Sequence, residues 1–384
     1  MQKRYRRYGL LLAVVAGMIF LASCSSFVKS FGKLPSGERL ARVESSPNYR
    51  DGEFKYMTPT SMFTGDASVT EWIKEMIFGP REGVRPNHAL PIVKTDLKGL
   101  DRNKDAVVWL GHSSFFLQIG GKRLLVDPVF SSHTSPISLI YRAFQDGYPY
   151  SAADMPELDA LVISHDHWDH LDYDTVMALK DKVKAVVTPL GVGSHFEYWG
   201  YEVSKIHEGD WYEDIRLDPQ LAILVTPARH FSGRGLTGNQ TLWGGFVFET
   251  PHRKVFYSGD GGYGPHFADV GKRFKDIDLA IVENGQYDAR WAQMHMMPEE
   301  SLQSGLDIGA KALLPVHAGR FALANHNWDA PYNRIAAASE GKKIRLLTPE
   351  IGEVVELSDL THSFPKWWEE GPAPQAQQNS SSHQ

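Results

Sequence analysis

The sequence has only one cysteine, Cys24, among its 384 residues. A disulfide within the chain is therefore excluded. Positive charge is also scarce, because 40 lysines and arginines face 46 aspartates and glutamates and the formal net charge is −6. A body with this excess of acid has no general attraction for phosphate backbones, so we do not expect nucleic acid as a partner.

The apolar run near the N-terminus, residues 10–22, is too short for a comfortable bilayer span. It follows a cluster of basic residues and has the length of a signal-peptide core. The run ends in Leu21-Ala22-Ser23-Cys24, which resembles the lipobox of bacterial lipoproteins. The resemblance implies a signal peptide over residues 1–23, lipidation of Cys24 and, because Ser25 follows, a location on the outer membrane facing the periplasm. An uncleaved signal anchor is the alternative.

The composition, 42% hydrophobic and 22% charged, is that of a chain that can bury a full core. We expect one catalytic domain over residues 101–360. A tether and N-terminal extension over residues 24–100 precede it, and a tail over residues 361–384 follows. The tail is rich in proline, alanine, glutamine and serine from about residue 372, which predicts disorder there.

Short apolar runs bounded by turn residues predict many strands within the catalytic domain. The predicted strands cover residues 107–110, 115–119, 123–126, 158–164, 183–188, 221–226, 245–249, 255–258, 279–283, 312–315 and 345–347. Helices are predicted over residues 173–181 and 298–308, the second with Pro298 in its first turn. Many short strands with interspersed helices indicate an α/β protein in which helices flank two sheets.

The strongest chemical signal is Ser164-His165-Asp166-His167-Trp168-Asp169-His170, which directly follows a predicted buried strand. His165 and His167 can converge on one point, and Asp169 and His170 on a neighbouring one. Imidazole and carboxylate ligands without thiolate are typical of a catalytic zinc or similar transition metal. A solvated histidine-rich loop is the alternative. Three further ligand-type residues that follow predicted strands favour the metal site: His230, Asp260 and His317.

Together these motifs resemble the metallo-β-lactamase superfamily over roughly residues 106–357. The branch that contains N-acylphosphatidylethanolamine phospholipase D and the ascorbate-6-phosphate lactonase-like hydrolases is the most similar. The residues that carry the resemblance are Trp109–Ser114, Asp127–Ser131, His165–Leu171, Leu242–Gly245, Gly259–Tyr263 and His317–Asn325. The resemblance implies an αββα sandwich, two mixed β-sheets flanked by helices, with two metal ions at one edge.

The resemblance also assigns the ligands. It implies that one zinc is held by His165, His167 and His230, that a second is held by Asp169, His170 and His317, and that Asp260 bridges them. Mn²⁺ is an alternative to zinc. Such a pair generates a bridging hydroxide, which Asp169 can orient.

Several other residues receive weaker assignments. His295 matches a family histidine near the cleft and is either a substrate contact or a packed histidine. Asp127 is either the acceptor that orients a ligand histidine or a turn residue before Pro128. His112 is expected to support the site from behind the ligands, with a role as a ligand as the alternative. The apolar insertion over residues 130–150 is either a lip that faces lipid or part of the core.

These patterns predict a metal-dependent hydrolase acting on a phosphodiester, with an N-acylphosphatidylethanolamine-type phospholipid as the first choice of substrate. The alternatives are a lactonase or small-ester hydrolase with the same metal centre, and a metal-binding envelope protein without turnover. Polar residues over Glu283–Asp288 replace small or apolar ones in the phospholipase pattern. The expected partners are a small-molecule or phospholipid substrate and, through the lipid anchor, a membrane.

Overall fold

The computed structural model describes residues 26–68, 70–71, 74, 78–79, 81–145 and 147–369. Cys24 and the tail expected to be disordered lie outside these residues. Across the described ranges, no helix is both long and apolar enough to cross a bilayer.

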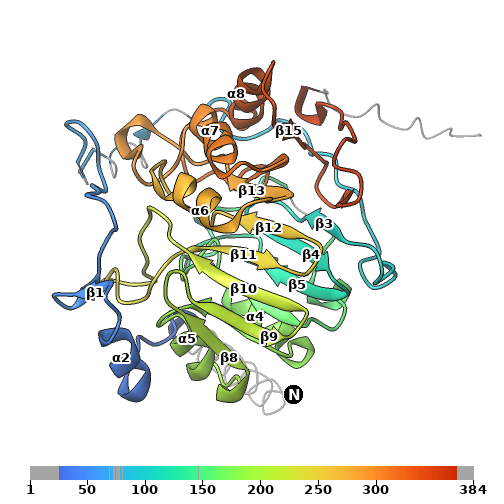
Figure 1. Cartoon of the computed structure of the whole chain (residues 1–384). Coiled ribbons are helices and arrows are strands. Elements are labelled where there is room, and N and C mark those ends of the chain that lie inside the picture. The colour runs from blue at the N-terminus through green and yellow to red at the C-terminus, as the bar shows by residue number, and fades with distance from the viewer. Residues whose placement is uncertain are drawn as a thin grey trace, which may run out of the picture.

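Two seven-stranded sheets lie face to face (Figure 1). The strands of the first are β9 (Asp214–Asp218), β10 (Leu221–Thr226), β11 (Gly245–Glu249), β12 (Lys254–Tyr257), β13 (Leu279–Glu283), β14 (Ala312–Val316) and β15 (Arg345–Leu346). They follow this order across the sheet, and they pair antiparallel from β9 to β12 and parallel from β12 to β15. The first sheet is therefore mixed.

The second sheet is mixed in the same way. Its strands are β3 (Ala106–Trp109), β4 (Phe115–Ile119), β5 (Lys122–Val126), β6 (Ala160–Val162), β7 (Val186–Pro189), β8 (Ile206–Gly209) and β16 (Val354–Glu356). The order is β16-β3-β4-β5-β6-β7-β8, antiparallel up to β5 and parallel from β5 to β8.

Alternating side chains explain why the two sheets pack together. Val107 and Trp109 of β3 enter the core between the sheets, while Val108 packs against the outer layer. In β13, Leu279 and Ile281 enter the central core, and the residues between them face the helices on the other side. Because successive side chains of a strand point to opposite faces, each sheet can bury both of its faces.

Helices cover the outer faces of both sheets (Figure 1). Side chains of α4 (Tyr173–Leu179) and α5 (Gly193–Tyr198) join the outer cluster of the second sheet. Those of α6 (His266–Phe274), α7 (Pro298–Ile308) and α8 (Ala330–Ser339) join that of the first. Helix α7 begins at Pro298 and ends before Gly309, whose φ of 76° is the left-handed conformation typical of a helix end. The expected αββα sandwich is confirmed.

Short elements complete the chain. They are α2 (Gly37–Glu44), β1 (Tyr49–Arg50), β2 (Glu53–Phe54) and the 3₁₀ turns η1 (Ala152–Asp154), η2 (Lys180–Lys182), η3 (Val203–Lys205), η4 (Ala289–Trp291) and η5 (Trp367–Glu369).

Most predicted elements coincide with observed ones, but the strand predicted over residues 158–164 is too long. Strand β6 ends at Val162. Beyond it, the backbone N–H and the hydroxyl of Ser164 both bond to Asp127, so the chain leaves the sheet at the point where the histidine motif begins. The helix predicted over residues 173–181 ends as an α-helix at Leu179 and continues as the 3₁₀ turn η2.

Candidate metal centre

The candidate site lies where several strands end. Asp127 directly follows β5, His317 directly follows β14, and Glu283 is the last residue of β13. His165 and Asp260 each lie three residues beyond a strand, β6 and β12 respectively. Because carboxyl ends of neighbouring parallel strands meet at one edge of a sheet, this topology gathers side chains from distant parts of the sequence.

The first group of ligand-type side chains consists of His165, His167 and His230, whose nitrogens all lie within 4.8 Å of one another. His165 Nε2 is 2.9 Å from His167 Nδ1, and His230 Nε2 is 3.2 Å from the same atom. His230 Nδ1 donates to the carbonyl of Met294 at 3.1 Å, which turns Nε2 toward the other two rings. The structure therefore brings together the three residues expected to share one metal ion.

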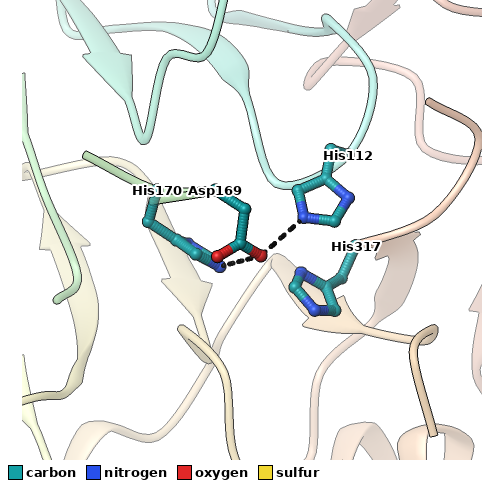
Figure 2. Close-up of side chains that lie close together, drawn as sticks. All are labelled: His112, Asp169, His170 and His317. Atoms are coloured by element: carbon teal, nitrogen blue, oxygen red, sulfur yellow. Dashed lines mark hydrogen bonds and ion pairs between the residues drawn. The ribbon is translucent and has the colours of Figure 1, made fainter. Parts of the chain in front are cut away.

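The second group contains Asp169, His170 and His317, as expected, together with His112 (Figure 2). His112 Nε2 donates to Asp169 Oδ2 at 2.9 Å, and His170 Nε2 lies 3.5 Å from the same oxygen. His112 is fully buried. It thus stands among the possible ligands, the reading that the sequence favoured less than a supporting role.

Asp260 lies between the two groups. Its Oδ2 is 2.9 Å from His170 Nε2 and 3.9 Å from His230 Nε2, and its Oδ1 is 3.2 Å from His317 Nδ1. A carboxylate that reaches one residue of the first group and two of the second occupies the position expected of a bridging ligand.

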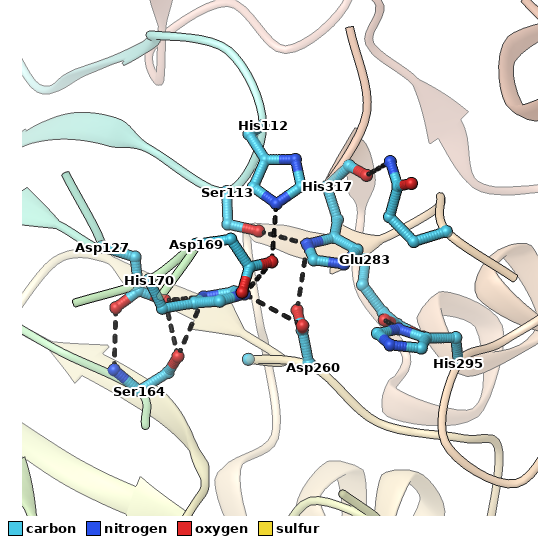
Figure 3. Close-up of polar contacts among 12 residues, drawn as sticks. His112, Ser113, Asp127, Ser164, Asp169, His170, Asp260, Glu283, His295 and His317 are labelled. Atoms are coloured by element: carbon cyan, nitrogen blue, oxygen red, sulfur yellow. Dashed lines mark hydrogen bonds and ion pairs between the residues drawn. The ribbon is translucent and has the colours of Figure 1, made fainter. Parts of the chain in front are cut away.

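Asp127 orients the second group from behind (Figure 3). Its buried carboxylate accepts a hydrogen bond from His170 Nδ1 at 2.7 Å and another from Tyr257 Oη at 2.7 Å. With Nδ1 committed to Asp127, Nε2 of His170 faces the cluster. Of the two readings of Asp127, this geometry supports the orienting acceptor.

Glu283 is a site residue that the sequence did not single out by itself. Its Oε2 accepts from His295 Nδ1 at 2.7 Å and its Oε1 accepts from the backbone N–H of Met296 at 2.6 Å. The His295 ring stacks at 5.1 Å on His317 and lies 5.1 Å from His230. The only available signal was that Glu283 begins the polar stretch that departs from the phospholipase pattern.

Asp166 is the member of the histidine motif that points away from the cluster. It accepts hydrogen bonds from His195 Nε2 at 3.1 Å, Thr241 Oγ1 at 2.8 Å and the backbone N–H of Gly233 at 2.6 Å. Arg234 donates to the carbonyls of Asp166 at 3.0 Å and Leu171 at 2.6 Å. These contacts fix both ends of the ligand-bearing loop.

The charges of the site follow from burial and from its carboxylates. Burial lowers the pKa of His165, His230 and His317 well below the usual range for histidine. Burial also acts against a charged His170, but Asp260, Asp169 and Asp127 outweigh it and hold the pKa of His170 well above that range. Burial raises the pKa of the Glu283 carboxyl to about 7, against the opposing effect of His295. Most of the imidazoles are thus neutral, the form that binds a metal ion.

Three buried polar atoms of the cluster support the presence of a cation. His112 Nδ1, Asp260 Oδ1 and His317 Nε2 make no aligned hydrogen bond with any described part of the chain. Buried polar atoms are normally satisfied, and their free energy cost is high when they are not. Neutral imidazole nitrogens and carboxylate oxygens form a suitable donor set for zinc or a similar transition metal, so the residues fit the metal.

The backbone at the site is held in an uncommon conformation. His112, Asp127, Gln286 and His317 have φ angles of 51°, 41°, 57° and 65°. This left-handed region costs a residue other than glycine roughly 1–3 kcal/mol, and such residues cluster at functional sites. Gln286 shows how the cost is offset, since its side-chain amide donates to the carbonyls of His317 and Phe321 and accepts from Leu323 N.

A cavity of about 470 Å³ opens above the cluster. Its polar floor is formed by His167, Asp169, His230, Asp260, Gln286, His295 and His317. Its walls are mainly apolar and aromatic, formed by Met62, Phe63, Tyr141, Trp168, Phe231, Trp291, Met294 and Leu323. An organic substrate with an apolar part can therefore bind with its polar centre against the ligand-type side chains.

An αββα sandwich with clustered imidazole and carboxylate ligands at one edge of its sheets defines a metal-dependent hydrolase. Residues 122–318 match the family model described as Beta-lactamase superfamily domain, and the chain belongs to this superfamily.

Known proteins match this chain over different shares of its length. The chain is 37% identical over 367 residues to an uncharacterised protein of Mycobacterium tuberculosis, covering 93% of this chain and 98% of the relative. It is 26% identical to N-acyl-phosphatidylethanolamine-hydrolyzing phospholipase D 1 of Caenorhabditis elegans, covering 82% of this chain and 98% of the relative. Outer membrane protein RomA of Klebsiella pneumoniae is 60% identical over 116 residues, 30% of this chain and 86% of the relative. A metallo hydrolase of Ignicoccus hospitalis has a similar fold, with a TM-score of 0.51 and 17% identity over 66% of this chain and 97% of that one.

Proposed function

We propose that this chain hydrolyses a phosphodiester, with an N-acylphosphatidylethanolamine-type phospholipid as the favoured substrate. The observation that carries the proposal is the cavity of about 470 Å³ with apolar walls and a floor of ligand-type side chains. Acyl chains can pack on the walls while the phosphoryl group lies at the floor. The named activity of the similar Caenorhabditis elegans phospholipase supports the same choice.

The proposed metal centre uses seven side chains. His165, His167 and His230 would hold one metal ion, Asp169, His170 and His317 a second, with Asp260 shared. Zinc is the favoured metal and Mn²⁺ the alternative. When bound, such a pair lowers the pKa of a coordinated water toward neutrality and stabilises negative charge on the reacting phosphoryl or acyl group.

The other polar groups of the cavity bind and orient the substrate. His295 borders the cavity, and Glu283 fixes its ring by accepting from Nδ1, so Nε2 is the nitrogen left for the substrate. His112 holds Asp169 through Oδ2, which keeps that carboxylate aligned with the floor of the cavity. The walls exclude water from the reacting bond once an apolar substrate fills them.

A substrate comparison tests this proposal. Purified full-length protein loaded with Zn²⁺ is assayed on N-acylphosphatidylethanolamine in mixed micelles, on a water-soluble phosphodiester and on a panel of lactones. We expect release of N-acylethanolamine and phosphatidic acid, with a kcat/KM at least tenfold above that for any lactone. The matched control is Asp169→Asn, which should lose activity on every substrate.

The alternatives predict other results. Preference for lactones or small esters would overturn the phospholipase assignment in favour of a lactonase with the same centre. Absence of turnover on all substrates, in protein that carries metal, would favour the metal-binding envelope protein without catalytic activity.

The proposed location is the outer membrane, facing the periplasm, through a lipid on Cys24. The lipobox-like Leu21-Ala22-Ser23-Cys24 supports it, as does the partial similarity to outer membrane protein RomA. Membrane anchoring would place the cavity close to a phospholipid substrate.

A further inference from the structure

We propose that the hairpin over residues 132–143, together with the arginine-lined cavity at its base, is a surface that binds an anionic phospholipid bilayer beside the metal centre. The hairpin belongs to the apolar insertion over residues 130–150. The kinetic test of this surface rests on the proposed function. The lipid-binding test does not depend on the reaction.

Backbone hydrogen bonds join the two sides of the hairpin. Its two sides are joined by bonds from Thr134 N to Tyr141 O at 3.1 Å and from Ala143 N to Ser132 O at 2.8 Å. At its tip, Ile140 N bonds to Ile137 O at 2.9 Å. These bonds join the two sides of the hairpin and close its tip.

The tip carries exposed apolar side chains. Ile137, Leu139 and Ile140 are 50%, 80% and 42% exposed. Contiguous exposed apolar residues are uncommon on a soluble surface and mark an interaction site. The insertion was expected to be either a lip that faces lipid or part of the core. The tip of the hairpin is exposed and so is not part of the core.

The base of the hairpin is fixed to the loop that carries His317. Phe144 N donates to the carbonyl of Arg320 at 2.8 Å. The guanidinium of Arg320 donates to the carbonyls of Phe130 and Ser131 and lies 3.4 Å from the ring centre of Tyr148. The tip is therefore held at a set position relative to the metal centre.

A second cavity, of about 700 Å³, lies at this base and is lined by Arg81, Arg85 and Arg142 together with Leu139 and Ile140. Arg85 donates to the carbonyls of Arg142 and Ala143, and Arg81 donates to Asn325 Oδ1 at 3.4 Å. All three arginines take part in further interactions, so none of them is without a partner. Three cationic groups at one place on a chain of net charge −6 favour an anionic ligand.

Tyr141 joins the two cavities. Its side chain lines both the arginine-lined cavity and the cavity above the metal ligands. A soluble anion would need the arginines but not the exposed apolar tip. An apolar tip beside cationic groups fits the interface of a bilayer, where apolar side chains enter the acyl region and arginines meet anionic headgroups. A lipid held there lies next to the metal centre.

The lipid-binding test uses a label at the tip. The full chain carrying Cys24→Ser and Leu139→Cys is labelled with an environment-sensitive fluorophore and mixed with vesicles of phosphatidylethanolamine and phosphatidylglycerol in a 3:1 ratio. We expect a blue shift and quenching by brominated lipid. The matched control is Val93→Cys in the same background, since Val93 is an apolar residue, 38% exposed, that lies outside the hairpin and bonds to Ile351.

Two further comparisons identify the headgroup. Vesicles of phosphatidylcholine alone should give little quenching at position 139. In the anionic vesicles, Arg81→Gln and Arg142→Gln should each lower the ratio of inserted to free label about fivefold. Equal quenching at positions 139 and 93, or quenching that does not depend on phosphatidylglycerol, would overturn the proposal. Loss of the signal on adding millimolar inorganic phosphate would also overturn it in favour of a small-anion site.

The kinetic test compares Leu139→Ser with Val93→Ser. We expect Leu139→Ser to raise the KM for substrate embedded in vesicles severalfold relative to its KM for a water-soluble phosphodiester, while Val93→Ser leaves this ratio unchanged. An unchanged ratio in both variants counts against the bilayer surface. If neither substrate is hydrolysed, the proposed function fails, and the label at position 139 still decides whether the hairpin meets the bilayer.

Discussion

Asp260 is the residue on which the two halves of the candidate centre depend, because its carboxylate lies 3.9 Å from His230 of the first group and 2.9 Å from His170 of the second. We predict that Asp260→Ala loses activity and at least one metal ion, since two cations would then face each other without their shared anion. Metal analysis and turnover of the purified variant check this. The matched control is Asp269→Ala. Asp269 is an exposed carboxylate paired with Lys272, and its loss should change neither activity nor metal content. Full metal content in Asp260→Ala would contradict the bridging role.

His295 should behave differently from Asp260. We predict that His295→Ala keeps both metal ions and loses turnover, because the ring borders the cavity and is held by Glu283 without being needed as a ligand. Unchanged kinetics in this variant would return His295 to a packing role.

Glu283 should act through His295. A hydrogen bond to a charged group is worth about 1.5–3 kcal/mol, so Glu283→Ala should lower turnover by roughly tenfold to a hundredfold. Glu283→Gln, which keeps an acceptor for Nδ1, should retain more activity than Glu283→Ala. If the two variants lose equal activity, loss of the hydrogen bond that orients His295 does not explain the lower turnover.

The sequence revealed the seven proposed ligands but not all of their neighbours. The ligands were visible because histidine and aspartate stand at strand ends or in one short motif. Glu283 enters the site at the end of β13, and His112, which was expected behind the ligands, is brought among them by the left-handed turn at residue 112. A sequence does not show such backbone geometry. Asp166 lies inside the motif, yet its side chain turns away to His195, a contact between residues far apart in the chain.

The loop between β6 and α4 carries most of the ligands, and Arg234 holds it through hydrogen bonds to its backbone carbonyls. This buried guanidinium also donates to Ser30 O at 2.8 Å and lies 4.0 Å from the ring centre of Trp168. One side chain thus joins the ligand loop to the N-terminal segment.

Loss of the Arg234 hydrogen bonds should weaken metal binding. We predict that Arg234→Gln leaves buried carbonyls unpaired, at a cost of about 1–3 kcal/mol for each, and lowers the affinity for metal in a chelator competition. The exposed Arg216→Gln on β9 is the control. An affinity equal to that of the unaltered chain would show that the loop does not need the Arg234 hydrogen bonds.

The elements that the sequence predicted best are the buried strands. Strands β4, β10, β11 and β13 and helix α7 have the predicted bounds. Edge strands β8, β9 and β16 were missed. Strand β9, Asp-Ile-Arg-Leu-Asp, alternates charged and apolar residues over only five positions, and short edge strands form because a neighbouring strand pairs with them rather than by their own propensity.

In the molecule as a whole, the segment that follows the proposed lipidation site packs against the neighbourhood of the ligand loop. The described chain begins at Ser26, only two residues after Cys24, and Lys33 N bonds to His195 Nδ1 at 3.1 Å. His195 in turn bonds to Asp166 of the ligand loop. A lipid on Cys24 would therefore hold the catalytic domain near the membrane through a packed segment.

Replacing the acyl acceptor tests the anchor. We predict that Cys24→Ser blocks lipidation and processing, because a hydroxyl cannot replace the thiol, whereas the unaltered protein takes up labelled fatty acid and partitions into the membrane fraction. Each buried CH₂ is worth about 0.8 kcal/mol, so several acyl chains hold a protein firmly. Intact mass showing residues 1–23 retained on the mature protein would favour the uncleaved signal anchor.

Elemental analysis of protein purified without chelator tests whether the seven nitrogen and oxygen ligands form a two-metal centre. Seven ligands are too many for one tetrahedral zinc, so we predict two transition-metal ions per chain. A content near zero that added Zn²⁺ or Mn²⁺ does not restore would contradict it.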